Sequence, residues 1–348
     1  MISVAWTAVK VIFAVATGLN IAGFLGWLER KQSAVLQDRV GANRAEIFGF
    51  RVLGFFHPLA DALKMLTKED YIPPFARQPF YAMAPGISLG FGLLGLAALP
   101  FGGNITAFGH SVSLQPIQSP YGLLLVLGLL SLGVHGVVMA GYSSASNYGL
   151  IGGLRGASQM IAYEVCLATT LSSVAFVYGT LDLQQAVLWQ GHLLFGFIPA
   201  WGIVLQPLGF LLFLTAAAAE TKRTPFDLPE GESEIVGYHV EYSGMKFGMF
   251  LMTDFVESIV VSGLATALYL GGWQVPGLHL AGALGGLVMV IAFLAKVMLV
   301  LFLLMQIRWT LPRFRFDQLL DLGWKNILPL SLLNFLLTVW GVYLWRLR

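Results

Sequence analysis

Residues 283–305 read ALGGLVMVIAFLAKVMLVLFLLM, with Lys296 as the single charged side chain. A helix needs about 20 mainly apolar residues to cross the hydrocarbon core of a bilayer, so this stretch predicts a membrane-spanning helix. The whole chain shares this character, because 57% of its 348 residues are hydrophobic and 11% are charged. Soluble domains are about 45–50% apolar and about 25% charged. The sequence therefore predicts a membrane protein.

Seven other stretches have a similar length and composition. The eight predicted spans are 4–28, 79–100, 120–141, 157–179, 199–219, 246–271, 283–305 and 326–345. The first is too long for the core of a signal peptide and lacks a basic start and a small-residue cleavage site, so we interpret it as a retained span. The predicted fold is an all-α integral membrane protein. Eight transmembrane helices form one polytopic membrane domain over residues 1–348, with short amphipathic helices in the cytoplasmic loops.

Positive charge is concentrated on one side of the predicted bundle. Most of the 20 lysines and arginines follow the first, third, fifth and seventh spans, and none lies in 101–119, 180–198 or 272–282. Loops rich in Lys and Arg stay in the cytoplasm. The pattern therefore predicts that both termini face outward, although Arg346 and Arg348 run against it. The charged side is a candidate docking surface, unless the bias reflects membrane insertion only.

The first cytoplasmic loop contains HPLADALKMLTKED, residues 57–70. At 100° per residue its leucines share one side: Leu59, Leu63 and Leu66. The opposite side carries charge: Asp61, Lys64 and Lys68. This is the pattern of a short amphipathic helix. Two interpretations stay open: a helix lying at the membrane interface, or a helix packed on the bundle with a solvated polar side.

Ionisable residues within spans are energetically costly and are functional candidates by default. They are Glu164, Glu220, Glu241, Asp254, Glu257, Lys296 and His135. Asp254 and Glu257 are three residues apart and share a helix face. Burial makes protonation of a carboxyl group possible near neutral pH, and a series of such groups is typical of a proton relay. Alternatively, they pair with Lys296, Arg223 or backbone groups and only fix the packing. For His135 we favour a satisfied interior histidine.

The segment ETKRTPFDLPEGESE, residues 220–234, gathers acids between two apolar spans. Pro225 and Pro229 prevent a continuous helix, and Gly231 permits a tight turn. Irregular backbone at membrane depth is tolerated only where protein buries it or where it lines a watery cavity. We expect the carboxylates, with Lys222 and Arg223, to line such a cavity. The alternative is a solvated cytoplasmic loop.

Several chemistries are not supported by this sequence. The single cysteine, Cys166, cannot supply an internal disulfide, a zinc site or an iron–sulfur cluster. No Gly-rich phosphate loop follows a strand-like segment, so nucleotide binding is unsupported. Any redox cofactor is therefore expected in a partner.

Five segments together carry a family resemblance: ERKQSAVLQDRVGANR (29–44), HPLADALKMLTKED (57–70), RGASQMIAYE (155–164), ETKRTPFDLPEGESEIVGYHVEYSGMKF (220–247) and RFRFDQLLDLGWKNILPL (313–330). Through them the chain resembles, almost end to end, the quinone-site membrane subunits of respiratory complex I, the NADH:quinone oxidoreductase. The resemblance implies an eight-span, non-redox subunit of a proton-pumping enzyme. In that family quinone enters between the first span, the amphipathic helix and the sixth span, and is reduced at the interface with peripheral subunits.

The resemblance also implies cofactors and partners. Quinone is the expected substrate and nothing is bound covalently, while FMN, NADH and iron–sulfur clusters belong to partner subunits. Peripheral-arm iron–sulfur and quinone-site subunits are expected on the cytoplasmic face, and small and antiporter-like subunits within the lipid bilayer. No nucleic acid is expected. The implied location is a bacterial plasma membrane, with the mitochondrial inner membrane as the alternative.

Two sets of site residues carry over from the family motifs. The quinone chamber and its access route are implied at Glu29, Arg30, Arg39, Asp61, Lys64, Arg315 and Asp317. A proton channel is implied at Glu164, Glu220, Arg223, Asp227, Glu230, Glu232, Glu234, Glu241 and Asp254. No catalytic residue is expected in this chain alone, and no metal ligand.

The sequence departs from the family pattern at several points. Ala42 replaces the usual proline, Lys222 stands where asparagine is usual, and EIVGYHVEY (234–242) looks one residue short. Asp254 replaces a typical glutamate, and Glu257 is additional. These departures concern the details of the channel.

Two other functions remain as alternatives. The first is the equivalent subunit of a membrane-bound hydrogenase or ferredoxin-linked complex, but such relatives usually diverge in the PFDLPE run, which is intact here. The second is an autonomous proton or cation transporter. That function predicts inverted repeats and paired broken helices, and the sequence shows no such pattern.

Overall fold

The computed structural model describes residues 2–107, 110–194, 198–229, 231, 235, 237–277 and 282–346. In these residues seven helical segments are long and apolar enough to cross a membrane. They are α1 (Ile2–Leu36), α3 (Gln78–Ala97), α4 (Gly122–Ser143), α5 (Asn147–Tyr178), α9 (Gly244–Tyr269), α10 (Gly282–Thr310), and the continuous run of α11 (Phe316–Asp321), the π-helical turn η1 (Leu322–Ile327) and α12 (Leu328–Arg346). The prediction of a helical, multi-pass membrane protein is confirmed.

The predicted span at 199–219 differs in form from the others. It is divided into α7 (Gly202–Leu205) and α8 (Pro207–Glu220). Between them Gln206 has φ −138° and ψ 68°, which is not helical. Pro207 starts the second piece because proline lacks the N–H that a continuous helix requires but fits the first turn of a new one. The fifth predicted span is therefore a short apolar helix of 14 residues preceded by a single turn.

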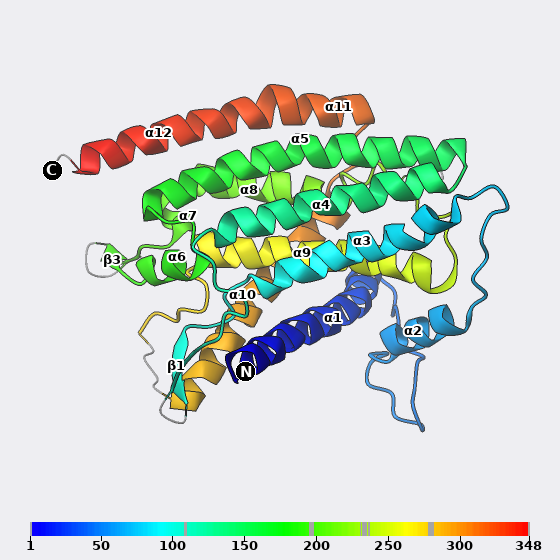
Figure 1. Ribbon diagram of the computed structural model, residues 1–348, viewed down its shortest axis with the longest axis horizontal. Helices are drawn as coiled ribbons and strands as arrows, with labels where there is room; N and C mark the ends of the chain where they lie inside the picture. Colours follow the sequence, from blue (N-terminus) through cyan, green and yellow to red (C-terminus); the bar gives the residue numbers. More distant parts are fainter. Residues whose placement is uncertain are drawn as a thin grey trace.

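Two short hairpins and a small helix occupy the loops that lack basic residues. The hairpins are β1 (Asn104–Ala107) with β2 (His110–Ser113), and β3 (Leu193–Leu194) with β4 (Ile198–Pro199). The helix is α6 (Leu183–Trp189). Figure 1 shows these elements at one end of the bundle, together with both chain termini, and the short helix α2 at the opposite end. The bundle therefore has a hairpin end and a charged-loop end.

Helices α3, α4 and α5 form a closely packed layer. A side chain at Gly136 of α4 would collide with the backbone of Ser88 in α3, and one at Gly141 would collide with the carbonyl oxygen of Gly149 in α5. Membrane helices associate through such close backbone contact, because lipid tails are as apolar as the helix surfaces and little hydrophobic driving force remains.

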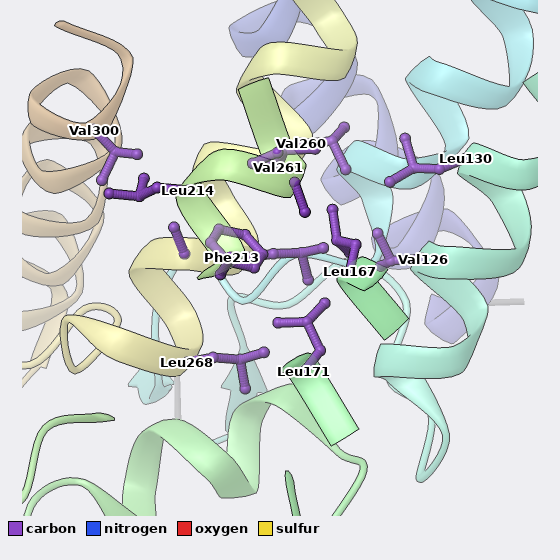
Figure 2. Close-up of a cluster of buried hydrophobic side chains, with 14 of the residues drawn as sticks. Val126, Leu130, Leu167, Leu171, Phe213, Leu214, Val260, Val261, Leu268 and Val300 are labelled. Atoms are coloured by element: carbon purple, nitrogen blue, oxygen red, sulfur yellow. The ribbon is translucent and has the colours of Figure 1, made fainter. Parts of the chain in front are cut away.

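The core is built around the short helix α8 (Figure 2). Phe213 and Leu214 of α8 lie among buried side chains of four other helices. These are Val126 and Leu130 of α4, Leu167 and Leu171 of α5, Val260, Val261 and Leu268 of α9, and Val300 of α10. Because α8 is enclosed in this way, its C-terminal residue Glu220 is carried into the protein interior.

Helix α2 (His57–Thr67) is present as the sequence predicts. Met65 lies directly against Gly248 of α9, but Leu59, Leu63 and Leu66 are all exposed. The apolar side of α2 is thus not packed on the bundle. This arrangement agrees with a helix that lies at the membrane interface.

Lys296 serves as a cap at the hairpin end and is not a partner of the acids. Its ammonium group donates to the carbonyl oxygens of Leu270, Gly272 and Gln274 at 2.8, 2.9 and 2.7 Å. It also lies 4.6 Å from the ring centre of Trp201. These carbonyls end α9 and begin the turn that follows, where a cation also complements the helix dipole.

Replacing Lys296 with methionine tests this cap. Three carbonyl groups would lose a charged donor, so we expect the protein to lose about 2 kcal/mol or more of stability. The measurement is the Tm of the detergent-extracted protein and its amount in membranes. Lys325→Met is the control, because that ammonium pairs with Asp321 on an exposed surface. An unchanged Tm for Lys296→Met would show that the cap contributes little.

Candidate functional site

Several of the predicted channel residues, together with Glu29, lie at or beside the connection between α8 and α9, at the charged-loop end. Gln159 of α5 fixes this connection, because its side-chain amide donates to the carbonyl oxygens of Ala219 and Phe226, both at 2.7 Å. The ring of Phe226 stacks on Phe314, with centres 5.4 Å apart. The irregular backbone between the prolines is thus held by protein contacts from two sides, as membrane depth requires.

Lys222 forms the centre of a buried ionic cluster with Asp254 and Glu257. Its Nζ lies 3.1 Å from Oδ1 of Asp254 and 3.3 Å from Oε2 of Glu257. The lysine side chain is 0% exposed, and the two acids are 11% and 3% exposed. Lys222 follows the end of α8 with φ 51°, in the left-handed region. We call these three residues the Lys222 cluster.

Glu220 lies beside this cluster without a direct ion pair. It is 2% exposed, and within the described residues neither carboxylate oxygen has a hydrogen-bond partner. Glu257, Glu164 and Lys222 are its electrostatic neighbours. Ser131 of α4 is in turn a polar neighbour of Glu164. Carboxyl groups therefore run from α9 past the end of α8 to the α4–α5 layer.

A second ionic group joins three helices nearer the loops. Glu29 of α1 accepts from Arg223 at 3.1 Å and also from Arg308 of α10. The guanidinium of Arg223 lies 4.2 Å from the ring centre of Phe255 on α9. Arg223 also interacts electrostatically with Glu257 and Asp227. Arg223 thus connects the predicted quinone residue Glu29 with the predicted channel residues.

Asp227 lies in the connection between α8 and α9, outside the spans. Arg313 donates to its Oδ2 at 2.8 Å. Burial raises the pKa of Asp227 to about 6, while the positive charge of Arg313 opposes the increase. A carboxyl group with this pKa changes protonation close to neutral pH.

The other predicted quinone residues fall into separate groups. Arg30 pairs with Asp61 at 2.5 Å and so joins α1 to α2. Arg39 is exposed just beyond α1, and Lys64 is exposed on α2. Arg315 and Asp317 form a local exposed pair at 3.4 Å at the start of α11. The fold therefore brings Arg30 and Asp61 together, whereas Arg315 and Asp317 face solvent.

Among the described residues, the others predicted for the channel or the interior do not lie in these ionic groups. Glu230, Glu232 and Glu234 lie outside the described residues. The Glu241 carbonyl accepts a hydrogen bond of 2.8 Å from the Tyr81 hydroxyl, which joins the segment before α9 to α3. The expectation of an interior His135 is wrong, because this residue is exposed on α4. Hydropathy identifies a span but does not say which side of the helix faces outward.

Sequence reasoning missed several partners in these clusters. The sequence marks Glu257 as an ionisable span residue and Lys222 as part of the charged connection, but it does not predict that the two form an ion pair. Arg308 and Arg313 carry no predicted role, yet they bind Glu29 and Asp227. One signal was available: two acids on one buried helix face need a nearby cation.

Two further features are relevant to the predicted site: groups that could hold a metal ion, and an apolar cavity at the hairpin end. In the described part of the chain no group of three or more His, Cys, Asp or Glu is arranged to hold a metal ion. A cavity of about 780 Å³ lies at the hairpin end between α5, α6, α8 and α12. Trp189, Leu337 and Trp345 contribute to its apolar lining. None of the residues predicted for quinone or protons lines this cavity.

Known proteins similar to this chain are named as subunits of NADH-quinone oxidoreductase. One from Koribacter versatilis is 40% identical over 350 residues, 95% of each chain. Another from Geobacter metallireducens is 42% identical over 323 residues, 92% of each chain. A third from Thermomicrobium roseum is 41% identical over 332 residues, 93% of each chain. Residues 9–339 match the family described as NADH dehydrogenase, and the chain therefore belongs to that family.

Proposed function

We propose that this chain is the membrane subunit of a proton-pumping NADH:quinone oxidoreductase, which forms the quinone chamber with peripheral subunits and couples quinone reduction to proton movement. The observation that carries the proposal is the line of ionisable groups that begins at half-buried Asp227 and passes the buried Lys222 cluster and buried Glu220 to half-buried Glu164. Ionisable groups in series within a membrane bundle are the usual material of a proton relay.

The two ends of this line differ in a way that suits a relay. Asp227, with a pKa of about 6, can exchange protons with the charged-loop side. Glu164 has Ser131 of α4 as a polar neighbour, and exposed His135 lies one helical turn further along α4. Because an exposed histidine within a span is costly in lipid, this side of α4 suits contact with another membrane subunit. The line therefore leads from the quinone side toward the neighbouring membrane subunits.

The quinone chamber is proposed at the charged-loop end, between this chain and its peripheral partners. The pair of Arg30 and Asp61 links α1 to the interfacial helix α2, beside the exposed leucines. A quinone tail can approach there from the bilayer. Exposed Arg39, Lys64, Arg315 and Asp317 then suit contact with the headgroup or a peripheral subunit. Through Glu29 and Arg223, a charge change in the chamber would act on the acids within the bundle.

The remaining assignments follow the family resemblance. We infer that the complex lies in a bacterial plasma membrane and that the termini, which share the hairpin end, face outward. Partner subunits carry the FMN and iron–sulfur clusters and dock on the charged-loop end. Small and antiporter-like subunits lie beside the bundle in the membrane.

Gentle extraction of the tagged chain from native membranes tests this assignment. We expect mass spectrometry to find flavin-binding and iron–sulfur subunits together with antiporter-like subunits. Recovery with a nickel–iron hydrogenase subunit would contradict the proposal, and so would a chain that purifies alone and moves protons alone in liposomes.

The substitution Glu220→Gln tests the relay. Glutamine keeps the size of the side chain but cannot release a proton, so we expect quinone-linked proton translocation to fall by about 10-fold or more. The amount of assembled complex should change less. Translocation is followed with a pH-sensitive dye in inverted vesicles. Unchanged translocation by a fully assembled variant would remove Glu220 from the path.

The carboxyl group of Asp227 gives a pH signature. Loss of its proton as pH rises through about 6 should produce an inflection in the translocation rate. Arg313→Gln removes the charge that opposes the raised pKa, so the inflection should move to higher pH. Asp227→Asn should abolish it. An inflection that stays in place in both variants belongs to another group.

A further inference from the structure

We propose that Lys222 is a positioning residue of the proton path: it holds Asp254 and Glu257 of α9 in one buried ionic cluster and so leaves Glu220 as the carboxyl group that exchanges the proton. The inference rests on the proposed function and adds a role for one buried cation within it.

Lys222 contacts two acidic side chains and holds both in place. A single ammonium group reaches both acids of one helix face, at 3.1 and 3.3 Å. With no part of the lysine side chain exposed, water cannot replace these contacts. A buried charge without an opposite charge nearby is strongly destabilising. Lys222 and the two acids therefore depend on one another.

The backbone conformation of Lys222 directs its side chain toward α9. Its φ of 51° is left-handed, a conformation that glycine and asparagine adopt more readily than lysine. The backbone N–H of Lys222 donates to the carbonyl oxygen of Ala219 in the last turn of α8. The side chain thus leaves the helix end at the point where α9 passes. A lysine that only solubilised this loop would not need to be buried here.

Glu220 differs from the two α9 acids in its contacts with positive charge. Within the part of the chain that the structure describes, the ionisable groups that face one another here include Glu220 at the end of α8, Lys222 after it, and Asp254 and Glu257 on α9. Both α9 acids lie in contact with the ammonium group, whereas neither oxygen of Glu220 has a hydrogen-bond partner in the described chain. Glu220 also has Glu257 and, from α5, Glu164 as negative neighbours. Arg223 adds positive charge near Glu257. A carboxyl group in this position is best accommodated with a proton, which it gives up when the surrounding charge changes.

The test is a double-mutant cycle in the intact complex, with Lys222→Asn, Glu257→Gln and both together. Asparagine is chosen because it tolerates the left-handed backbone. Each single change leaves the cluster with altered net charge, so we expect proton translocation per assembled complex to fall by about 10-fold or more. The double variant removes one positive and one negative charge. It should recover to within about 3-fold of the unmodified complex.

The readouts are chosen to separate positioning from stability. Assembly is measured as the amount of complex, and coupling as protons moved per electron delivered to quinone. Lys222→Arg keeps the charge and should keep the coupling ratio even if assembly falls. Lys325→Asn, which breaks an exposed pair with Asp321, is the matched control and should change neither readout.

Each outcome decides the role. Recovery of proton translocation in the double variant supports the positioning role of Lys222. This holds even if one of the single variants fails to assemble. Full coupling in assembled Lys222→Asn overturns it, and so does a double variant that assembles but pumps no better than either single variant. An unmodified complex that contains the chain yet moves no protons would instead refute the proposed function itself.

Discussion

An ionised side chain inside a membrane bundle needs a compensating partner in contact. At the charged-loop end that partner is an opposite charge, and the architecture of this end depends on such contacts. Lys222 meets this need with Asp254 and Glu257, and Glu29 meets it with Arg223 and Arg308. These contacts tie α1, α9 and α10 to the connection after α8. Lipid supplies little driving force for helix association, so such polar ties contribute both to packing and to chemistry.

Contacts from neighbouring helices and loops also enclose the irregular backbone of this end. The connection after α8 begins at Glu220, and the side-chain amide of Gln159 donates two hydrogen bonds to its backbone region. Phe314 stacks on its Phe226, and Arg313 pairs with its Asp227. On one side lies the α3–α4–α5 layer, where glycines bring the backbones into contact. On the other lie α1 and α2, whose apolar surfaces are largely uncovered. The site therefore lies between a tightly packed layer and a surface that partners or lipid complete.

Much of this could be predicted from the sequence, for a physical reason. A helix that crosses lipid must be long and apolar, so the composition of the sequence predicts the spans. The helical spacing of leucines predicts α2. The acids between and within the spans also mark out the proposed path. Orientation and pairing could not be predicted, because they depend on which side of a helix faces the core. Thus Lys296 caps the end of α9, His135 is exposed, and Pro207 divides a span that hydropathy alone joins.

A charge pair buried as deeply as Lys222 and Glu257 also constrains evolution. A lineage that changes one position alone passes through a chain with an unbalanced charge in its interior. Neutral drift at these sites is therefore blocked, although the residues are 35 positions apart in sequence. The two codons should change together or not at all, so that lysine at one position is inherited with an acid at the other. The pair would leave a record of covariation in sequences that differ freely elsewhere.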